Sequence, residues 1–293
     1  MSATCHGGSE PRQFPTALPA KITIPYLQAK KHKGERISAL TAYDYATARL
    51  ADEAGIELLL VGDSLAQVVL GYDSTLPVSV EEMLHHSRAV RRGLERALLV
   101  VDMPFGSYHA GVDAALENAI RFVKEGGAEA VKIEGARSSL VERMTQSEIP
   151  VVAHLGLTPQ SVNRMGGYRV QARTIETGQQ LLDDALALEG AGAAMVVLEG
   201  IPRELAERVT AALAIPTIGI GAGPACDGQI LVFHDLVNLS FAPAAKFVRR
   251  YCDAATMMRD AMVSYRTDVE RGDFPNDAES YHAAAMHPVA RKA

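Results

Sequence analysis

Ionisable side chains follow several short apolar stretches of this chain. Asp63 follows LLLVG, Asp102 follows LLVV, Lys132 and Glu134 close AVKIE, His154 follows VVA, and Glu199 follows MVVL. One such residue alone is usually a helix cap or a turn former. Five stretches in succession indicate a shared site instead, because active sites of α/β barrels are built where the strands end.

Four of these residues are carboxylates, and this restricts the chemistry of the expected site. If Asp63, Asp102, Glu134 and Glu199 face one barrel mouth, they cannot all stay ionised without sharing a proton or binding a cation. Lys132 lies two residues from Glu134 and so on the same strand face, but one ammonium cannot balance four carboxylates. Because every candidate ligand atom is oxygen, a hard divalent ion is expected, Mg²⁺ rather than zinc.

The elements that must position these residues are short apolar runs that alternate with longer amphipathic stretches. The runs are apolar throughout, as expected of parallel strands covered on both faces. We expect strands over 37–42, 57–61, 97–101, 130–134, 150–154, 194–198, 216–220 and 230–233, and helices over 45–53, 80–92, 112–125, 138–145, 177–190 and 203–212. Ser79, three residues before Glu82, predicts a capping box at the start of the second helix.

Eight strands alternating with helices predict a single-domain (β/α)₈, or TIM, barrel. We assign residues 21–274 to the barrel, 1–20 to a polar N-terminal tail and 275–293 to a C-terminal tail. The alternative is an open doubly wound sheet, because the segment 221–229 is too short for a seventh helix. Two adjacent glycines at 166–167, before Tyr168, suggest a turn or a lid.

Composition excludes several classes of function. With 293 residues, 48% hydrophobic and 22% charged, the chain is not disordered as a whole. A net charge of −6 and the absence of Trp argue against nucleic acid as a partner. Cys5, Cys226 and Cys252 form no CxxC pair, so we expect a reducing cytoplasm. No apolar run reaches the roughly 18 residues of a membrane span, and the N-terminal residues 7–13 are too polar for a signal peptide.

Longer stretches of the sequence resemble the ketopantoate hydroxymethyltransferase family. In order along residues 22–282 these stretches are VGDSL (61–65), DSTLPV (73–78), VKIEG (131–135), HLGLTPQS (154–161), GGYRVQ (166–171), GIGAG (219–223) and DGQILV (227–232). Long colinear stretches are far more specific than any short motif. The family has a (β/α)₈ fold, which agrees with the strand count. Ala245 departs from the family, which commonly has proline there.

The resemblance implies a reaction and a role for each site residue. A hydroxymethyl group passes from 5,10-methylenetetrahydrofolate to 3-methyl-2-oxobutanoate, giving 2-dehydropantoate on the route to pantothenate and coenzyme A. Carried over by position, Asp63 and Asp102 bind Mg²⁺, Glu134 completes the metal site directly or through water, Ser64 and Lys132 hold the substrate carboxylate, Glu199 is the general base, and His154 lines the same pocket. A homo-oligomer is also expected, a decamer in related bacterial enzymes.

Two other functions remain as alternatives. A Mg²⁺-dependent carbon–carbon lyase of the phosphoenolpyruvate mutase and isocitrate lyase type would also use a barrel, a metal and 2-oxo acids. Such lyases usually carry a catalytic Cys in a Lys-Lys-Cys-Gly-type loop, which this sequence lacks. A non-catalytic barrel would be favoured by substitution of a key carboxylate, and none of the candidate positions is substituted.

Overall fold

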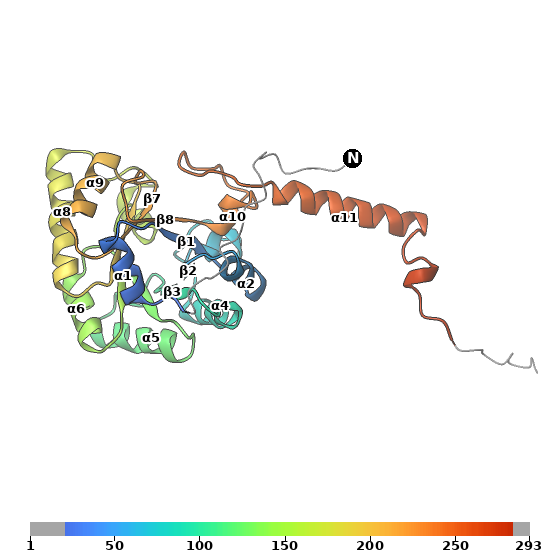
Figure 1. Ribbon diagram of the computed structural model, residues 1–293, viewed down its shortest axis with the longest axis horizontal. Coiled ribbons are helices and arrows are strands. Elements are labelled where there is room, and N and C mark those ends of the chain that lie inside the picture. The colour runs from blue at the N-terminus through green and yellow to red at the C-terminus, as the bar shows by residue number, and fades with distance from the viewer. Residues whose placement is uncertain (1–20, 284–293) are drawn as a thin grey trace, which may run out of the picture.

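Eight parallel strands close into a barrel in the order of the sequence (Figure 1). This computed structural model describes residues 21–283, so the tail expected at 1–20 and the end of the C-terminal tail lie outside the described residues. The strands are β1 (Ile37–Thr41), β2 (Leu58–Val61), β3 (Leu98–Asp102), β4 (Ala130–Glu134), β5 (Val151–Gly156), β6 (Met195–Glu199), β7 (Thr217–Ile220) and β8 (Gly228–Leu231). Because β8 pairs with β1, the (β/α)₈ barrel is confirmed and the open sheet is excluded.

The helices that cover the barrel begin and end within two residues of the predicted positions. They are α2 (Tyr45–Glu53), α4 (Val80–Gly93), α5 (Val112–Lys124), α6 (Ser138–Gln146), α8 (Ile175–Gly190) and α9 (Arg203–Ala212). The capping box of Ser79 and Glu82 is present at the start of α4. Helix α8 begins two residues early because Thr174 and Thr177 form a second capping box. The chain between β7 and β8 contains no helix, as the length of this segment predicted.

The structure adds elements that the sequence pattern did not predict. They are α1 (Ile24–His32), α3 (Leu65–Val68), η1 (Pro159–Ser161), α7 (Val162–Met165), α10 (Phe233–Leu236), α11 (Ala254–Arg271) and η2 (Asp277–Glu279). Most are single turns, too short to give a period. Helix α1 closes the amino-terminal end of the barrel, because Ile22 and Leu27 pack with the residues of the barrel interior.

Helix α11 extends away from the barrel (Figure 1). None of its residues is buried. Met258, Met262, Tyr265 and Val269 lie at spacings of four, three and four residues, and each is between 47% and 63% exposed. This spacing places an apolar stripe on one face of the helix. Among the helices of residues 21–283, none is both long enough and apolar enough to cross a membrane.

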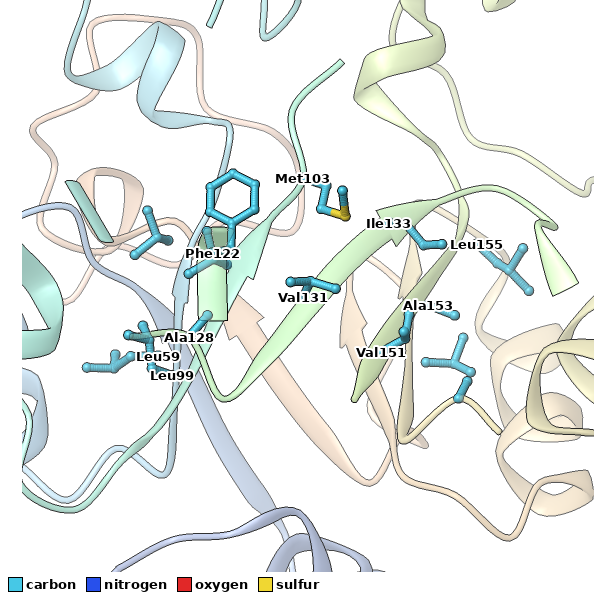
Figure 2. Close-up of a cluster of buried hydrophobic side chains, with 14 of the residues drawn as sticks. Leu59, Leu99, Met103, Phe122, Ala128, Val131, Ile133, Val151, Ala153 and Leu155 are labelled. Atoms are coloured by element: carbon cyan, nitrogen blue, oxygen red, sulfur yellow. The ribbon is translucent and has the colours of Figure 1, made fainter. Parts of the chain in front are cut away.

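Two apolar layers hold the barrel and orient the residues between them. Outward-facing residues such as Val131 and Ile133 pack under the helices, as Figure 2 shows for the region of β3 to β5. Inward-facing residues such as Ala130 and Val152 fill the barrel interior. Because strand residues alternate between the two faces, Lys132 falls on the inner face, one layer above Ala130. The layer nearest the carboxyl ends of the strands is therefore polar.

The prediction for the eighth strand was wrong by two residues. It was expected at 230–233, but β8 spans Gly228–Leu231, where Gly228 aligns with Ile37 of β1 and Ile218 of β7. Pairing with strands on both sides outweighs the low strand propensity of glycine. Phe233 instead begins α10, and its N–H donates to Thr41 Oγ1.

Candidate active site

A cavity of about 350 Å³ opens at the carboxyl end of the barrel and collects the residues predicted to form the site. Asp63, Ser64, Asp102, Lys132, Glu134, His154 and Glu199 all line it. The register explains part of this convergence. Asp102 is aligned with Lys132 across β3 and β4, and Glu134 with His154 across β4 and β5. Inward-facing residues aligned on neighbouring strands point into the same layer of the barrel.

Asp102 links two of the predicted site residues, Lys132 and Asp63, at the β2–β4 side of the cavity. One carboxylate oxygen accepts from Lys132 Nζ at 2.7 Å, and the other accepts from the backbone N–H of Asp63 at 3.0 Å. All three residues are buried. Burial and the charges of Asp102 and Glu134 raise the pKa of Asp63 well above its ordinary value. A cation at Asp63 would relieve this cost, because an opposite charge favours the ionised carboxylate.

His154 lies between two carboxylates. Its Nδ1 is 3.5 Å from Glu134 Oε1, and its Nε2 is 3.3 Å from Glu199 Oε2. Burial and the Lys132 ammonium act to lower the pKa of His154, but the two carboxylates outweigh them and raise it to about 9. The two carboxylates therefore favour the protonated imidazole, which the sequence alone did not reveal.

Strand β5 is longer than predicted, and the extension fixes Glu199. The strand continues past His154 to Gly156, which aligns with Glu199 of β6. Gly156 has φ +95°, and a Cβ at this position would lie 2.2 Å from the backbone oxygen of Glu199. Only glycine permits this approach. The side chain of Glu199 keeps 16% of its surface exposed, so among the cavity carboxylates it remains accessible to a bound molecule.

Gln160 is a site residue that sequence reasoning missed. Its side-chain amide donates to Asp63 Oδ2 at 2.9 Å, and its backbone N–H donates to Glu134 Oε2 at 3.0 Å. Tyr108 in turn donates to Gln160 Oε1, which fixes the orientation of the amide. Gln160 therefore ties a residue that follows β2 to one on β4. It stands within the family-like stretch 154–161, but no local pattern indicates that it turns inward.

Two further polar residues, Tyr43 and Thr75, belong to the site. The hydroxyls of Tyr43 and Ser64 lie 2.8 Å apart, so Tyr43 orients Ser64, which lines the cavity. Thr75 lines the cavity and is buried, yet its hydroxyl has no hydrogen-bond partner. Buried hydroxyls are normally paired, so Thr75 is a candidate contact for a bound molecule. Its signal in the sequence was the loop DSTLPV, which carries part of the family resemblance.

The β7–β8 side of the mouth is mostly apolar and has one carboxylate. It is lined by Ile220, Val232, Asp235, Ala245 and Phe247. Ala245, the departure from the family pattern, is thus part of the cavity wall. Tyr168 also lines the cavity, which places the segment suspected of being a lid next to the site.

A larger cavity of about 870 Å³ lies under the loops after β3, β4 and β5. It shares only Glu134 with the cavity that contains the other charged residues. Its lining includes Arg137 and Arg164, but none of the other predicted site residues. The chemistry therefore belongs to the smaller cavity.

The charges of the smaller cavity fit a divalent cation. Five carboxylates line it beside two basic side chains, Lys132 and His154, so the acidic groups outnumber the basic ones. Within residues 21–283, no group of three or more His, Cys, Asp or Glu side chains is arranged to hold a metal ion. The carboxylates that would hold such an ion are Asp63 and Asp102, with Glu134 in the same cavity. Mg²⁺ is typically held in this way, by one or two carboxylates together with water and substrate oxygens.

Several solved structures share this fold, among them a member of the phosphoenolpyruvate mutase/isocitrate lyase superfamily. A phosphonopyruvate hydrolase, in complex with oxalate and Mg²⁺, superposes with a TM-score of 0.60, at 14% identity over 87% of this chain and 92% of that protein. A 2,3-dimethylmalate lyase has a TM-score of 0.57, at 18% identity over 85% and 86% of the two chains. At such low identity the similarity extends to the fold alone, so it gives no support to lyase activity.

Sequence comparison identifies the family more specifically than the similarity of fold does. The family model for ketopantoate hydroxymethyltransferase matches residues 21–277. A 3-methyl-2-oxobutanoate hydroxymethyltransferase from Koribacter versatilis is 60% identical over 265 residues, which cover 90% of this chain and 90% of that protein. The enzyme of the same name from Geobacter sulfurreducens is 54% identical, over 88% and 98% of the two chains. These matches, together with the barrel fold and the charged cavity at its mouth, show that this chain belongs to the ketopantoate hydroxymethyltransferase family and is a hydroxymethyltransferase.

Proposed function

We propose that the protein transfers a hydroxymethyl group from 5,10-methylenetetrahydrofolate to 3-methyl-2-oxobutanoate, producing 2-dehydropantoate for pantothenate and coenzyme A biosynthesis. The observation that carries the proposal is the placement of Glu199 in one cavity with Lys132, Asp63 and Asp102. An accessible carboxylate thus faces groups suited to bind a 2-oxo acid. The names of the relatives from Koribacter versatilis and Geobacter sulfurreducens support the same substrate.

Mg²⁺ is the proposed metal, held by Asp63 and Asp102, with Glu134 acting through water. When bound, the ion supplies Lewis-acid stabilisation of negative charge on the oxygens of the oxo acid. Glu134 Oε2 accepts from the backbone N–H of Gln160 and Oε1 lies 3.5 Å from His154 Nδ1, and we therefore assign Glu134 an indirect role. Gln160 holds Asp63 in place for the ion.

The protein side chains perform the binding and proton transfer. Lys132 and Ser64 hold the substrate carboxylate, with Tyr43 fixing the Ser64 hydroxyl. Glu199 removes the proton from C3, and the electron pair of the C–H bond becomes the enolate. His154 orients Glu199 through the 3.3 Å contact. A new bond then joins C3 to the methylene carbon of the folate. This carbon is bonded to two folate nitrogens, N5 and N10, so one C–N bond opens before C3 attacks and the second breaks afterwards. Water supplies the hydroxyl oxygen, and the released nitrogens take up protons.

Our proposal for the partners follows from the same residues. The ligands are a 2-oxo acid and a folate, with neither nucleic acid nor a membrane surface, because the acid surplus favours neither. We place the protein in the cytoplasm on its cysteine usage. We further propose a homo-oligomer, a decamer by resemblance, and the exposed apolar stripe of α11 supports association with further copies.

The decisive experiment measures exchange of the C3 hydrogen of 3-methyl-2-oxobutanoate in deuterated water, followed by NMR without folate. We expect exchange that requires Mg²⁺ and stops when EDTA is added. The double variant Asp63→Ala, Asp102→Ala should lose the metal dependence. Absence of exchange in the unmodified protein, or exchange that ignores EDTA, would refute the enolate mechanism.

A further inference from the structure

The residues that line the barrel mouth fall into two groups. Asp63, Ser64, Asp102 and Lys132 come from β2 to β4 or the residues that directly follow these strands, and they serve the oxo acid and the metal in the proposed function. Glu199 follows on β6. Because the barrel order is β6-β7-β8-β1, the wall after Glu199 is formed by β7, β8 and the chain that follows them. The proposed reaction assigns no role to this wall.

The unassigned wall combines a carboxylate with apolar and aromatic side chains. Asp235 of α10 is half-buried and is the fifth carboxylate of the cavity. Ile220 and Val232 line the cavity beside it, and Phe247 is 40% exposed. The Phe247 ring packs so closely on Gly221 that a Cβ there would lie 2.6 Å from Cδ1. The close contact with the backbone of Gly221 thus fixes the Phe247 ring at the mouth of the cavity. The ring does not pack on the hydrophobic core there.

The chemistry of the donor restricts where its ring system can bind. In 5,10-methylenetetrahydrofolate the transferred carbon is attached to a nitrogen of the pterin ring, so the pterin must enter the cavity that contains the oxo acid. A pterin has flat faces, which apolar and aromatic side chains complement. Its pyrimidine edge presents N3–H and the 2-amino group as parallel donors. An ionised carboxylate accepts two such donors with both oxygens.

We propose that Asp235 recognises the N3–H and 2-amino edge of the pterin, while Phe247 and Ile220 contact its face. This inference rests on the proposed function, because it assumes a folate donor. The other four carboxylates are committed elsewhere. Asp63, Asp102 and Glu134 are held by Gln160 or Lys132, and Glu199 must remain free to take the C3 proton.

The test compares two probes, tetrahydrofolate and its 2-desamino-2-methyl analogue, which lacks the 2-amino donor. Hydrogen bonds to a charged group correspond to roughly 10- to 100-fold in affinity. The unmodified protein should therefore bind tetrahydrofolate tighter than the analogue by roughly this factor. In Asp235→Asn, the affinity for tetrahydrofolate should fall and the ratio between the two probes should approach one. A general loss of structure would weaken both probes equally and leave the ratio unchanged.

The matched control is Asp113→Asn, which removes an exposed carboxylate from α5 outside the cavity and should keep the full ratio. Equal binding of both probes by the unmodified protein, or an unchanged ratio in Asp235→Asn, would overturn the inference. Folate-independent exchange at C3 separates this failure from that of the proposed function. If C3 exchange is present but the affinity ratio of the two probes does not behave as expected, only the role of Asp235 is refuted. If C3 exchange is absent, the proposed function is refuted.

Discussion

At the scale of single residues, the site depends on buried charged groups, each of which would be unfavourable in the barrel interior without a partner of opposite charge. Lys132 and His154 are buried, and burial disfavours a cation. Asp102, Glu134 and Glu199 favour the charged forms of both side chains. The excess of carboxylates over basic groups supports the proposed metal ion. Removing one partner would leave a buried charge unpaired, so these residues should be less tolerant of substitution than their surroundings.

The residue with the most specific chemical assignment is Glu199. Replacing it by glutamine keeps the shape but removes the proton acceptor, so Glu199→Gln should lose turnover by roughly 10²- to 10⁴-fold. Binding of Mg²⁺ and of the oxo acid should be largely retained, as measured by titration calorimetry. Glu204→Gln changes an exposed residue of α9 and serves as the control. Normal turnover in Glu199→Gln would disprove the assignment of the base.

At the scale of elements, the starts of helices and the ends of strands are determined by different interactions. The helix starts follow side chains a few residues away, as at Ser79 and Thr174. The strand ends instead follow pairing, as β5 and β8 demonstrate. The physical reason is that a helix cap forms its hydrogen bonds within one turn. The backbone groups of a strand instead form theirs with a segment that is distant in the sequence.

The capping box of α4 provides a test at this scale. Ser79→Ala removes the acceptor for the N–H of Glu82 and should lower the free energy of unfolding by about 1 kcal/mol. Because Ser79 does not line the cavity, turnover at a temperature well below unfolding should not change. Urea denaturation measures the first quantity and a steady-state assay the second. Ser139→Ala, on the exposed face of α6, should change neither, and equal stabilities of all three proteins would exclude the capping contribution.

At the scale of the whole molecule, α11 is the part that the barrel does not explain. It packs no residue into the core, and its apolar stripe of Met258, Met262, Tyr265 and Val269 faces outward. Exposed stripes of this kind usually mark an interaction surface. The proposed homo-oligomer gives this surface a partner of the same sequence.

Association can be tested on this stripe. We expect the full chain to sediment as a homo-oligomer, and the double variant Met258→Glu, Met262→Glu to shift towards smaller species, because paired acidic residues oppose burial. Ser264→Glu adds charge on the opposite face of α11 and should leave the sedimentation coefficient unchanged. A monomeric full chain would contradict the proposed assembly, and an unaffected double variant would exclude α11 from it.

The sequence by itself determined the class of fold and most of the candidate site. Strands covered on both faces produce continuous apolar runs, and the polar residues that end these runs must meet at one rim once the sheet is parallel. The predicted acidic residues, Lys132 and His154 therefore lie in one cavity. Their placement required only that strand count and direction be inferred correctly.

Only the tertiary structure decided which atoms meet. Gln160 reaches Asp63 across 97 positions of the sequence, and Tyr43 reaches Ser64 from another strand end. The charge of His154 depends on Glu134 and Glu199 together, so no local pattern encodes it. Closure of the barrel and the register of β8 are likewise set by pairing with distant segments. Local rules fix what each segment prefers, but the electrostatics of the site arise from segments that meet only after folding.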